Sequence, residues 1–343
     1  MKPNHLFEQL IAKQNLDTQQ MQEVLHACMS GQLSDAQIAT FLALMRMKGE
    51  TAEELTAAAT VMQRLAHSID LGPQLIDIVG TGGDGKNTFN VSTACSFVVA
   101  AAGVSVAKHG NRSVSSRSGS ADVLEEAGFI LDLPEEQIQT CIKECKLAFL
   151  FAPHYHPAMQ HARSARQQLG IRTFFNLLGP LLNPAHVKRQ VVGVFSPSWL
   201  MPLAEVLAHL GSERALVISA QDGLDEISIA AATDVMEYNN KTFKQWIINP
   251  EDYGIKYHNI DDIIVDSPSE SLKLIKEVFA GTLGAARDMV LLNSAAALYC
   301  AKDNLSFASA ITEAKSVIDS GKAADCFERL CLITQRYKES NHD

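Results

Sequence analysis

The stretch that decides the fold class is LIDIVGTGGDGKNTFNVSTACSFVVAAAGVSVAKHGN, residues 75–111. It begins with the apolar run Leu75–Val79, continues through a glycine-rich loop and an alanine-rich segment, and reaches a second apolar run at Val104–Ala107. Short apolar runs on either side of a helical pattern predict a strand, a loop, a helix and a second strand. Because glycine lets backbone N–H groups approach phosphate oxygens closely, we expect an anionic ligand at this loop.

Four more strand-like runs follow, and several are separated by helical patterns such as residues 157–169 and 198–210. The tail from Leu272 to Arg336 returns to a helical pattern. Such alternation predicts an α/β fold with a mixed, largely parallel central sheet flanked by helices. The four runs are Ala148–Phe151, Gln190–Phe195, Ala215–Ile218 and Val235–Tyr238.

The N-terminal part of the chain, Leu6–Leu65, has a helical pattern throughout. Capping boxes that begin at Ser34 and Thr51 divide it into about four short helices. Helices this short need a partner surface, so we expect them to form a small domain of their own. The predicted domains are a mainly α-helical one over residues 1–72, joined by part of 166–190, and an α/β one over residues 73–343.

Composition and charge exclude several classes of function. The chain has 343 residues, 47% hydrophobic and 20% charged, as expected for a folded protein of two domains. Its net charge of −10 argues against nucleic-acid binding, which depends on concentrated Lys and Arg, so an anionic ligand must meet a local basic patch. The sequence shows no apolar stretch long enough to cross a membrane and no signal core at residues 1–6, which predicts a cytoplasmic protein.

The seven cysteines are scattered, and none of them is spaced as CxxC. Cys141 and Cys145 lie one helical turn apart, but no second pair accompanies them. This spacing favours reduced thiols in the core over a zinc site.

The glycine-rich loop, GTGGDGKNT over residues 80–88, fits two common nucleotide motifs imperfectly. It matches G-x-G-x-x-G, but a dinucleotide site needs an acidic residue at the end of the second strand, where this chain has Lys108. It nearly matches G-x-x-x-x-G-K, but Asn87 replaces the hydroxyl residue after the lysine, and Asp84 would put a carboxylate in the phosphate cradle. A tight turn without a ligand is the third alternative.

A second loop, KHGNRSVSSRSGSAD over residues 108–122, follows the second predicted strand. It concentrates cations, hydroxyls and amide donors in a chain that is acidic as a whole. Arg and Lys supply charge, Ser and Gly supply compact donors, and the next helix presents its N-terminus near Ser120. The loop therefore predicts a polyphosphate clamp, with a solvated basic loop as the alternative.

Carboxylates gather in a third loop, where Asp222–Glu226 follow the strand-like run Ala215–Ile218. Carboxylate oxygens at the end of a strand suit Mg²⁺, which takes one or two carboxylates, keeps several waters and completes its shell with substrate phosphate. An acidic turn is commoner than a metal site when it stands alone. Because the glycine-rich loop and the basic loop are both predicted to bind phosphate, we favour a magnesium site over a simple acidic turn.

Two histidines, His154 and His156, alternate in the sequence. On an extended strand they would point to the same side, which suggests a metal site. No third ligand lies nearby in sequence, so a role in lining the substrate site or a hydrogen-bonded structural role is favoured.

Taken together, these segments resemble the anthranilate phosphoribosyltransferase family, and the resemblance extends over most of the chain. It includes NVST at residues 90–93, RQQLGIRT at 166–173, NLLGPLLNP at 176–184 and GLDE at 223–226. It implies a small helical domain hinged to a larger α/β domain, as in pyrimidine nucleoside phosphorylases. It also implies a pentosyltransferase of tryptophan biosynthesis that moves the phosphoribosyl group of 5-phosphoribosyl 1-pyrophosphate (PRPP) to the amine of anthranilate, with Mg²⁺ as cofactor and a homodimeric assembly.

The same resemblance assigns three groups of residues to ligands. Magnesium is assigned to Ser92, Asp225 and Glu226. Anthranilate is assigned to Gly80, Asn111 and Arg166, with His109 and His154 lining its route and with Arg166 as the positive partner of its carboxylate. One departure, Ser118 where some relatives carry cysteine, puts none of these in doubt. PRPP is assigned to Gly80, Gly83, Asp84, Thr88, Asn90, Val91, Ser92, Thr93, Lys108, His109, Gly110, Asn111, Arg112, Ser113, Val114, Ser115, Ser116 and Ser120.

The implied chemistry displaces pyrophosphate from the anomeric carbon, and its main task is to stabilise charge on the leaving group. The amine of anthranilate is nucleophilic when unprotonated, so we expect no general acid or base and no catalytic triad. Two alternatives stay open. A pyrimidine nucleoside phosphorylase-like enzyme would give Arg166 no carboxylate to meet, and a non-catalytic relative that binds nucleic acid would not need Asp225 and Glu226.

Overall fold

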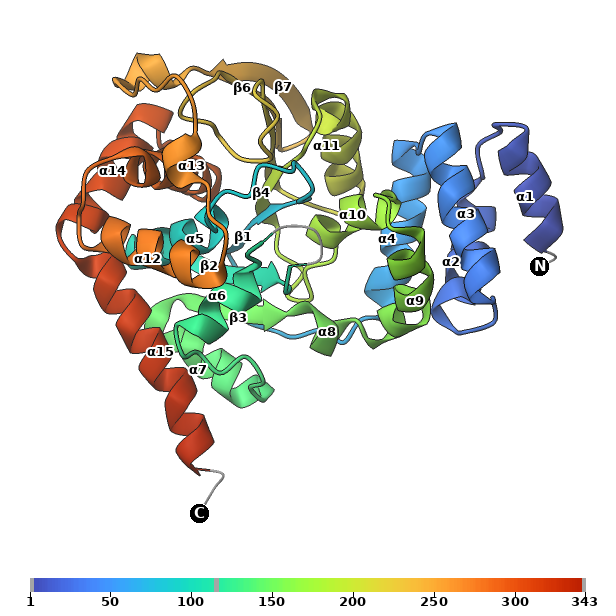
Figure 1. Ribbon diagram of the computed structural model, residues 1–343, viewed down its shortest axis with the longest axis horizontal. Helices are drawn as coiled ribbons and strands as arrows, with labels where there is room; N and C mark the ends of the chain where they lie inside the picture. The colour runs from blue at the N-terminus through green and yellow to red at the C-terminus, as the bar shows by residue number, and fades with distance from the viewer. Residues whose placement is uncertain (1–2, 114–116, 341–343) are drawn as a thin grey trace.

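A seven-stranded sheet forms the centre of the larger lobe of the molecule (Figure 1). The structure, a computed structural model, describes residues 3–113 and 117–340. The strands are β1 (Leu75–Gly80), β2 (Ser105–Gly110), β3 (Leu147–Phe151), β4 (Arg189–Gly193), β5 (Arg214–Ala220), β6 (Thr233–Asn239) and β7 (Thr242–Ile248). Their order is β3-β2-β1-β4-β5-β6-β7, parallel from β3 to β5 and antiparallel from β5 to β7. The predicted mixed, largely parallel sheet is confirmed.

Strand β7 is the one element of this sheet that the hydrophobic pattern did not predict. Its apolar run is confined to the three residues 246–248, and only the last residue, Ile248, is buried. It pairs with β6 through a two-residue turn at Asn240 and Lys241, whose φ angles of 44° and 71° lie in the left-handed region. A two-residue hairpin turn requires this backbone, and asparagine tolerates it well.

The smaller lobe is helical (Figure 1). The capping boxes predicted at Ser34 and Thr51 are confirmed, and a third, at Asp17, begins α2. Helices α9 and α10 come from the middle of the chain and pack against the N-terminal helices. The helices of this lobe are α1 (Pro3–Ile11), α2 (Thr18–Met29), α3 (Asp35–Lys48), α4 (Ala52–Leu65), α9 (Gln160–Leu169) and α10 (Phe174–Leu178).

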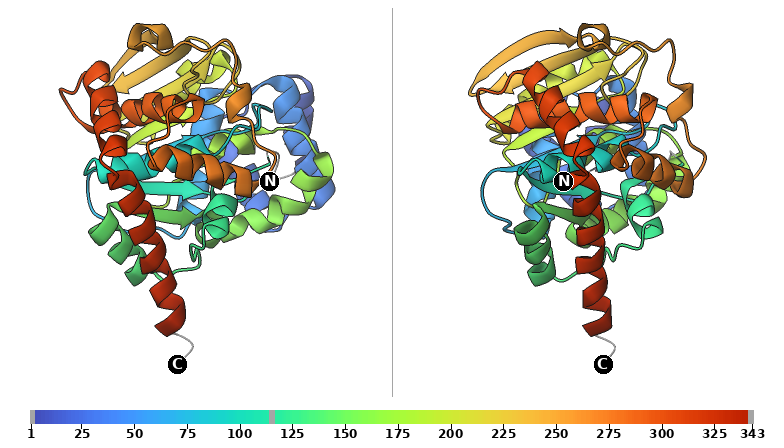
Figure 2. Two further views of the ribbon diagram at one scale, coloured as in Figure 1. Left: turned by 60° about the vertical axis from the view of Figure 1, so that its left-hand side comes forward. Right: turned by 90° about the vertical axis from the view of Figure 1, so that its left-hand side faces the viewer.

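The remaining helices surround the sheet (Figure 2). The helical patterns predicted over residues 157–169 and 198–210 begin within 3-10 turns that start at Pro157 and Pro197. Proline is tolerated at the start of a helix, where its missing N–H would have no partner. No helix in the described part of the chain has the length and apolar character needed to span a bilayer. These helices are α5 (Val91–Ala101), α6 (Ser120–Glu126), α7 (Glu135–Cys145), α8 (Ala152–Tyr155), α11 (Leu200–His209), α12 (Pro268–Phe279), α13 (Ala285–Ala301), α14 (Phe307–Asp319) and α15 (Lys322–Ser340), with 3-10 turns η1 (Pro157–Met159), η2 (Gly179–Leu181), η3 (Pro197–Trp199), η4 (Pro250–Tyr253) and η5 (Asp261–Ile263).

Alternate residues of the central strands enter two separate hydrophobic cores. Val191 and Leu216 face the core that α5 and α12–α15 complete, whereas Val192 and Val217 face the core shared with α11 and the helical lobe. Successive side chains of a strand point to opposite faces, so a sheet covered on both faces needs continuous apolar runs. This is why the parallel strands could be predicted from such runs. All seven cysteines are free, and five of them are buried.

Candidate active site

The three loops singled out from the sequence follow the carboxyl ends of β1, β2 and β5. Strands β2, β1, β4 and β5 are neighbours in the sheet, so their carboxyl ends lie side by side. The chain runs from β1 to β2 and β3 on one side and then returns to β4 and β5 on the other, so the strand order reverses between β1 and β4. Open α/β sheets bind ligands at this point.

The glycine loop after β1 is tied to its neighbours by backbone donors. The N–H of Gly82 donates to Oδ2 of Asp225 at 2.7 Å, and the N–H of Thr81 donates to the carbonyl of Gly193 at 2.9 Å. A Cβ added to either Gly80 or Gly193 would collide with Asp225. Because glycine has no side chain, the acidic turn, residues 222–226, can lie directly against the glycine loop at these two positions.

Helix α5 begins at the end of the glycine loop. Asn90 caps it, since its Oδ1 accepts the N–H of Thr93 at 3.1 Å. Lys108 reaches the same point from β2: it is buried, and its Nζ donates to the Ser92 hydroxyl at 3.0 Å. The Val91 side chain belongs to the core, so only its backbone is available to a ligand. Burial lowers the pKa of Lys108, and the negative charges of Asp77 and Glu226 oppose this shift. The helix N-terminus and the Lys108 ammonium both favour an anion at this point.

Three carboxylates crowd beside this cation. Burial raises the pKa of Asp225 to about 7, and the nearby charge of Asp84 adds to the effect. Burial also raises the pKa of Glu226 well above its ordinary value, with Asp225 and Asp84 adding to the rise and Lys108 opposing it. The Oε2 atom of Glu226 is buried and has no hydrogen-bond partner among the described residues. Such crowding disfavours the charged carboxylates unless a cation joins them.

The donors present fit a magnesium ion that is bound together with phosphate. Within residues 3–113 and 117–340, no three His, Cys, Asp or Glu side chains converge closely enough to hold a metal ion by themselves. Mg²⁺ does not need such a cage, because it takes one or two carboxylates and completes its shell with waters and substrate phosphate. Asp225 and Glu226, with the Ser92 hydroxyl nearby, would be the contribution of the protein.

Asp77 fixes the backbone beneath this site. Its carboxylate accepts the side-chain N–H of Asn183 at 2.7 Å and the backbone N–H of His109 at 3.3 Å. Burial raises the pKa of Asp77 to about 6, although the positive charge of Lys108 lowers it in part. The network joins β1 to β2 and so sets where Lys108 and His109 lie.

The basic loop after β2 folds back on itself. Oδ2 of Asp122 accepts the N–H groups of Ser113 and Gly119 at 2.8 and 2.9 Å, and the Ser120 hydroxyl lies 3.4 Å from Oδ1 of Asn90. Gly110 ends β2, and Asn111 next to it is exposed. The two loops thus meet at Asn90. The predictions for Val114, Ser115 and Ser116 lie outside the described residues.

Arg112 does not contribute a free cation to this spot. Its guanidinium pairs with Glu125 of α6, at 3.1 Å from Nε to Oε2, and lies 4.8 Å from the centre of the Phe151 ring. Its proposed contact with PRPP stays a prediction.

The structure separates the two alternating histidines. They lie at the end of α8 and just after it, so this segment does not have the extended-strand geometry that would turn both side chains to the same side. His156 is buried: its Nε2 lies 2.9 Å from the carbonyl of Leu182, and its ring stands 5.2 Å from that of His109. His154 is exposed and faces Phe151 and Asp132. The neighbour of His109 is therefore His156, which the sequence did not single out for this position.

Arg166 lies near the end of α9, half-buried, with its guanidinium 5.1 Å from the centre of the Phe175 ring. Burial lowers its pKa from the ordinary arginine value. Stacking on an aromatic ring fixes the guanidinium plane and leaves its edge donors for a ligand. The structure does not by itself bring Arg166 into contact with the glycine loop.

Ser271 of α12 is a positioning residue whose role could not be predicted from the sequence. Its fully buried hydroxyl accepts the backbone N–H of Asn90 at 2.9 Å. The segment before α12 supports the same loop, because the N–H of Phe89 donates to Ile263 and the N–H of Val265 donates to Asn87, both at 2.9 Å. A serine 181 residues away from Asn90 carries no sequence signal for this role.

Ser271→Ala is expected to raise KM for PRPP about 5- to 20-fold, because it leaves the buried N–H of Asn90 without a partner. Steady-state kinetics with each substrate varied in turn would measure this, and Ser271→Thr, which keeps the hydroxyl, should recover most of the loss. The exposed Ser269 on the same helix provides the control variant Ser269→Ala. A lower melting temperature with an unchanged KM for PRPP would reduce Ser271 to a structural role.

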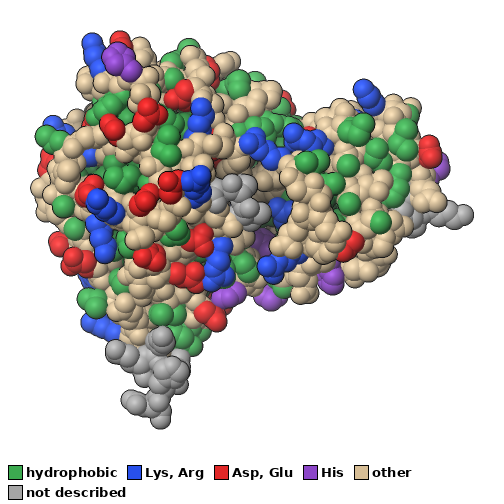
Figure 3. Space-filling model, in the orientation of Figure 1, with side chains coloured by type: hydrophobic (Ala, Val, Ile, Leu, Met, Phe, Trp, Pro, Cys, Tyr) green, Lys and Arg blue, Asp and Glu red, His purple; other side chains and the backbone are tan. Residues whose placement is uncertain are grey.

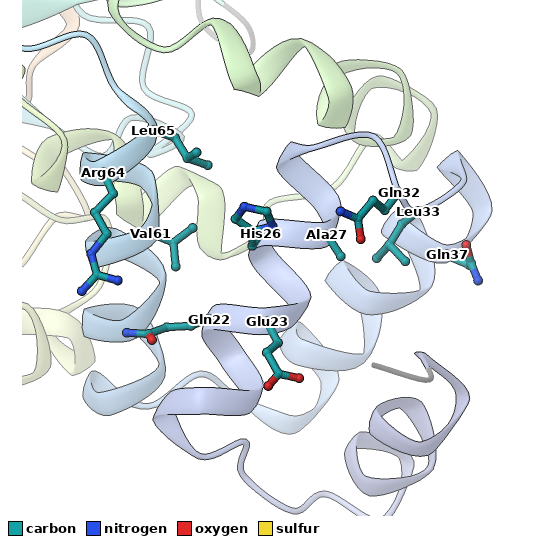
Figure 4. Close-up of a pocket in the computed structure, with 10 residues that line it drawn as sticks. All are labelled: Gln22, Glu23, His26, Ala27, Gln32, Leu33, Gln37, Val61, Arg64 and Leu65. Atoms are coloured by element: carbon teal, nitrogen blue, oxygen red, sulfur yellow. The ribbon is translucent and has the colours of Figure 1, made fainter.

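The open hollow of about 730 Å³ on the helical lobe is a different place (Figure 4). It lies between α2 and α4 and is lined mainly by amide and apolar side chains, with Arg64, Glu23 and His26 as its ionisable groups. It offers no concentrated positive charge for a polyphosphate. In the space-filling view, Lys and Arg side chains gather instead where the two lobes meet (Figure 3).

The sequence matches two family models that together cover most of the chain. Residues 72–324 match the α/β domain of a glycosyl transferase family, and residues 4–66 match the helical bundle domain of that family. A relative from Legionella pneumophila (strain Paris), named anthranilate phosphoribosyltransferase, is 72% identical over 100% of both chains. The chain belongs to the anthranilate phosphoribosyltransferase family.

Solved structures of this family share the fold described above. Anthranilate phosphoribosyltransferase from Thermus thermophilus has a TM-score of 0.89 and 38% identity, over 96% of this chain and 99% of that one. The Saccharomyces cerevisiae family member in complex with PRPP and Mg has a TM-score of 0.88 and 27% identity, over 97% and 98% of the two chains. The same yeast protein in complex with 4-fluoroanthranilate has a TM-score of 0.86 and 26% identity, over 96% and 97%.

Proposed function

We propose that this chain transfers the phosphoribosyl group of PRPP to the amine of anthranilate, giving N-(5-phosphoribosyl)anthranilate and pyrophosphate. The observation that carries the proposal is the bond from the Gly82 N–H to Asp225, which joins the glycine loop to the acidic turn beside Lys108. A loop of backbone donors, a buried cation and paired carboxylates are what a magnesium-bound pyrophosphate requires. The PRPP–Mg complex of the yeast relative supports this assignment.

The residues of the chain would act mainly by binding and orientation. Backbone N–H groups of the glycine loop and of α5 can stabilise charge that grows on the leaving pyrophosphate with little reorganisation. Lys108 is held by the Ser92 hydroxyl and so presents a fixed positive charge at the same place. Mg²⁺, when bound by Asp225 and Glu226, would neutralise the pyrophosphate further. The chemistry assigns no proton transfer to a side chain.

The nearest rival, a pyrimidine nucleoside phosphorylase-like activity, shares the fold class but not the relatives named above. Its uncharged substrate base would leave the guanidinium of Arg166 without a carboxylate to meet. The second rival, a nucleic-acid-binding protein without catalysis, would not need the costly carboxylate cluster of Asp84, Asp225 and Glu226.

One assay separates these three functions. Anthranilate is fluorescent, so its loss can be followed with PRPP and Mg²⁺ present and then with each omitted in turn. We expect turnover only with the complete mixture. Absence of turnover in the complete mixture, or phosphorolysis of a pyrimidine nucleoside instead, would overturn the proposal.

Arg166→Ala is expected to raise KM for anthranilate about 10- to 100-fold and to change KM for PRPP far less, because it removes the charge partner of the carboxylate. Arg163 lies on the same helix and is exposed, so Arg163→Ala is the matched control. Equal losses for the two substrates would remove the proposed role of Arg166.

The same proposal includes a homodimer and the predicted domain division, a helical domain over residues 1–72 with part of 166–190 and an α/β domain over 73–343. The exposed side chains of Ile11 and Met47 in the helical lobe support an interface there. Light scattering should give twice the chain mass, and Met47→Glu should lower it.

A further inference from the structure

Arg172 lies in the short link between α9 and α10, and both ends of this link are fixed. Gly170 closes α9 in the left-handed region at φ 62°, and its N–H donates to the carbonyl of Arg166 at 3.2 Å. Thr173 is buried and caps α10, with its N–H donating to Oδ1 of Asn176 at 3.1 Å. The direction in which Arg172 leaves the backbone is therefore set by the packing of the two helices.

The Arg172 side chain extends from this link to the glycine loop. A Cβ added to Gly83 would lie 2.8 Å from Nε and 3.2 Å from Cζ of Arg172, so the arginine covers the backbone of Gly83. The guanidinium also lies 4.8 Å from the centre of the Phe195 ring, which follows β4. Contacts on both sides hold the planar group at the carboxyl ends of β1 and β4.

The charge of Arg172 has no carboxylate partner within 4.0 Å among the residues that the structure describes, whereas Arg112, Arg189 and Arg214 all have one. Arg172 is half-buried and beside a loop that would bind pyrophosphate. A guanidinium has five N–H donors and matches phosphate oxygens in a bidentate way. Its donors are thus available to an anion bound at Gly83.

We propose that Arg172 is a further PRPP-binding residue, which contacts the pyrophosphate leaving group at Gly83. The inference rests on the proposed function and adds a cation that neither of the two phosphate-type loops supplies. Arg172 lies in the link that follows α9, close in sequence to Arg166. One short segment would therefore carry two cations, Arg172 for the leaving group and Arg166 for the carboxylate of anthranilate. Because α9 packs on α2 and α3, this contact would also join the helical lobe to bound PRPP.

Calorimetric titration of the full-length protein with inorganic pyrophosphate and with PRPP, both in Mg²⁺, tests the assignment directly. Arg172→Gln is expected to weaken binding of both ligands about 10- to 100-fold, since it removes a charge-assisted contact. Arg172→Lys, which keeps the charge but not the planar fork, should lose less. The exposed arginine variant Arg163→Gln should bind both ligands as the unmodified chain does.

Kinetics with the same variants distinguish this proposal from the proposed function. KM for PRPP and the inhibition constant of pyrophosphate should rise together in Arg172→Gln, while KM for anthranilate at saturating PRPP changes less than about threefold. Unchanged pyrophosphate binding in a folded variant, or an equal loss for anthranilate, would refute the role of Arg172. If Arg172→Gln does not fold, Arg172→Lys decides by the same two measurements. Failure of the unmodified chain to turn over would refute the reaction, whereas pyrophosphate binding would still be measured by calorimetry.

Discussion

Gly193→Ala is expected to lower kcat/KM at least about 100-fold. The new Cβ would overlap the backbone carbonyl of Asp225, and backbone cannot move aside as a flexible side chain can. The acidic turn would have to shift, which would break the bond from Gly82 to Asp225 and displace Glu226. Misplacement by about 1 Å can cost a factor of about 100 in rate.

Two other glycine variants serve as comparisons for the loss of activity expected in Gly193→Ala. Gly80→Ala meets the carboxylate of Asp225 rather than its backbone, so a smaller loss is expected. Gly179→Ala places its methyl group in open space at a φ of −45°, and it should retain near-normal stability. Steady-state kinetics and melting temperatures would measure the series. If Gly193→Ala keeps more than a tenth of the activity, the acidic turn is not fixed against β4.

The fold could be predicted where burial on both faces leaves a continuous apolar run. This holds for β1 to β6, whose apolar runs indicated the sheet and the α/β class. The ends of these runs lie within three residues of the observed strand ends. It fails for β7, an edge strand with exposed residues such as Phe243 and Ile247, because its apolar run is limited to residues 246–248. The turn at Asn240 and Lys241 was its one available signal.

The candidate site could be predicted where a residue type is unusual for its place. Glycines in series, a basic loop in an acidic chain and adjacent carboxylates all have this property. Ser271, Gly193 and Arg172 are ordinary residue types, and their importance comes from contacts across the fold that only the structure shows. For the two alternating histidines the sequence favoured a substrate-lining or hydrogen-bonded role, and only the structure shows that His156, just after the short helix α8, is the one beside His109.

Asp225→Asn combined with Glu226→Gln is expected to lower activity at least about 100-fold and yet to stabilise the protein in the absence of metal. The two carboxylates are buried near Asp84, which raises the pKa of both. Neutral amides remove this repulsion, and the Asn oxygen can still accept the Gly82 N–H. Melting temperatures in a chelator should therefore rise by about 2 °C or more at pH 8.

The pH dependence shows where the double variant should be more stable than the unmodified protein. Burial raises the folded-state pKa of Asp225 to about 7 from an ordinary value of 3.8. The stability that its neutral carboxyl contributes is therefore complete below about pH 4 and is lost as pH rises from there through 7. The gain from the amides should be present at pH 8 and absent near pH 4. Asp222→Asn in the same turn is the contrasting variant: its carboxylate accepts the Ser228 hydroxyl at 2.6 Å, so the amide should destabilise the protein and leave its Mg²⁺ dependence unchanged. If the Asp225→Asn, Glu226→Gln variant is destabilised as much as Asp222→Asn, then Asp225 and Glu226 stabilise the fold. The prediction that they destabilise the metal-free protein would then be wrong.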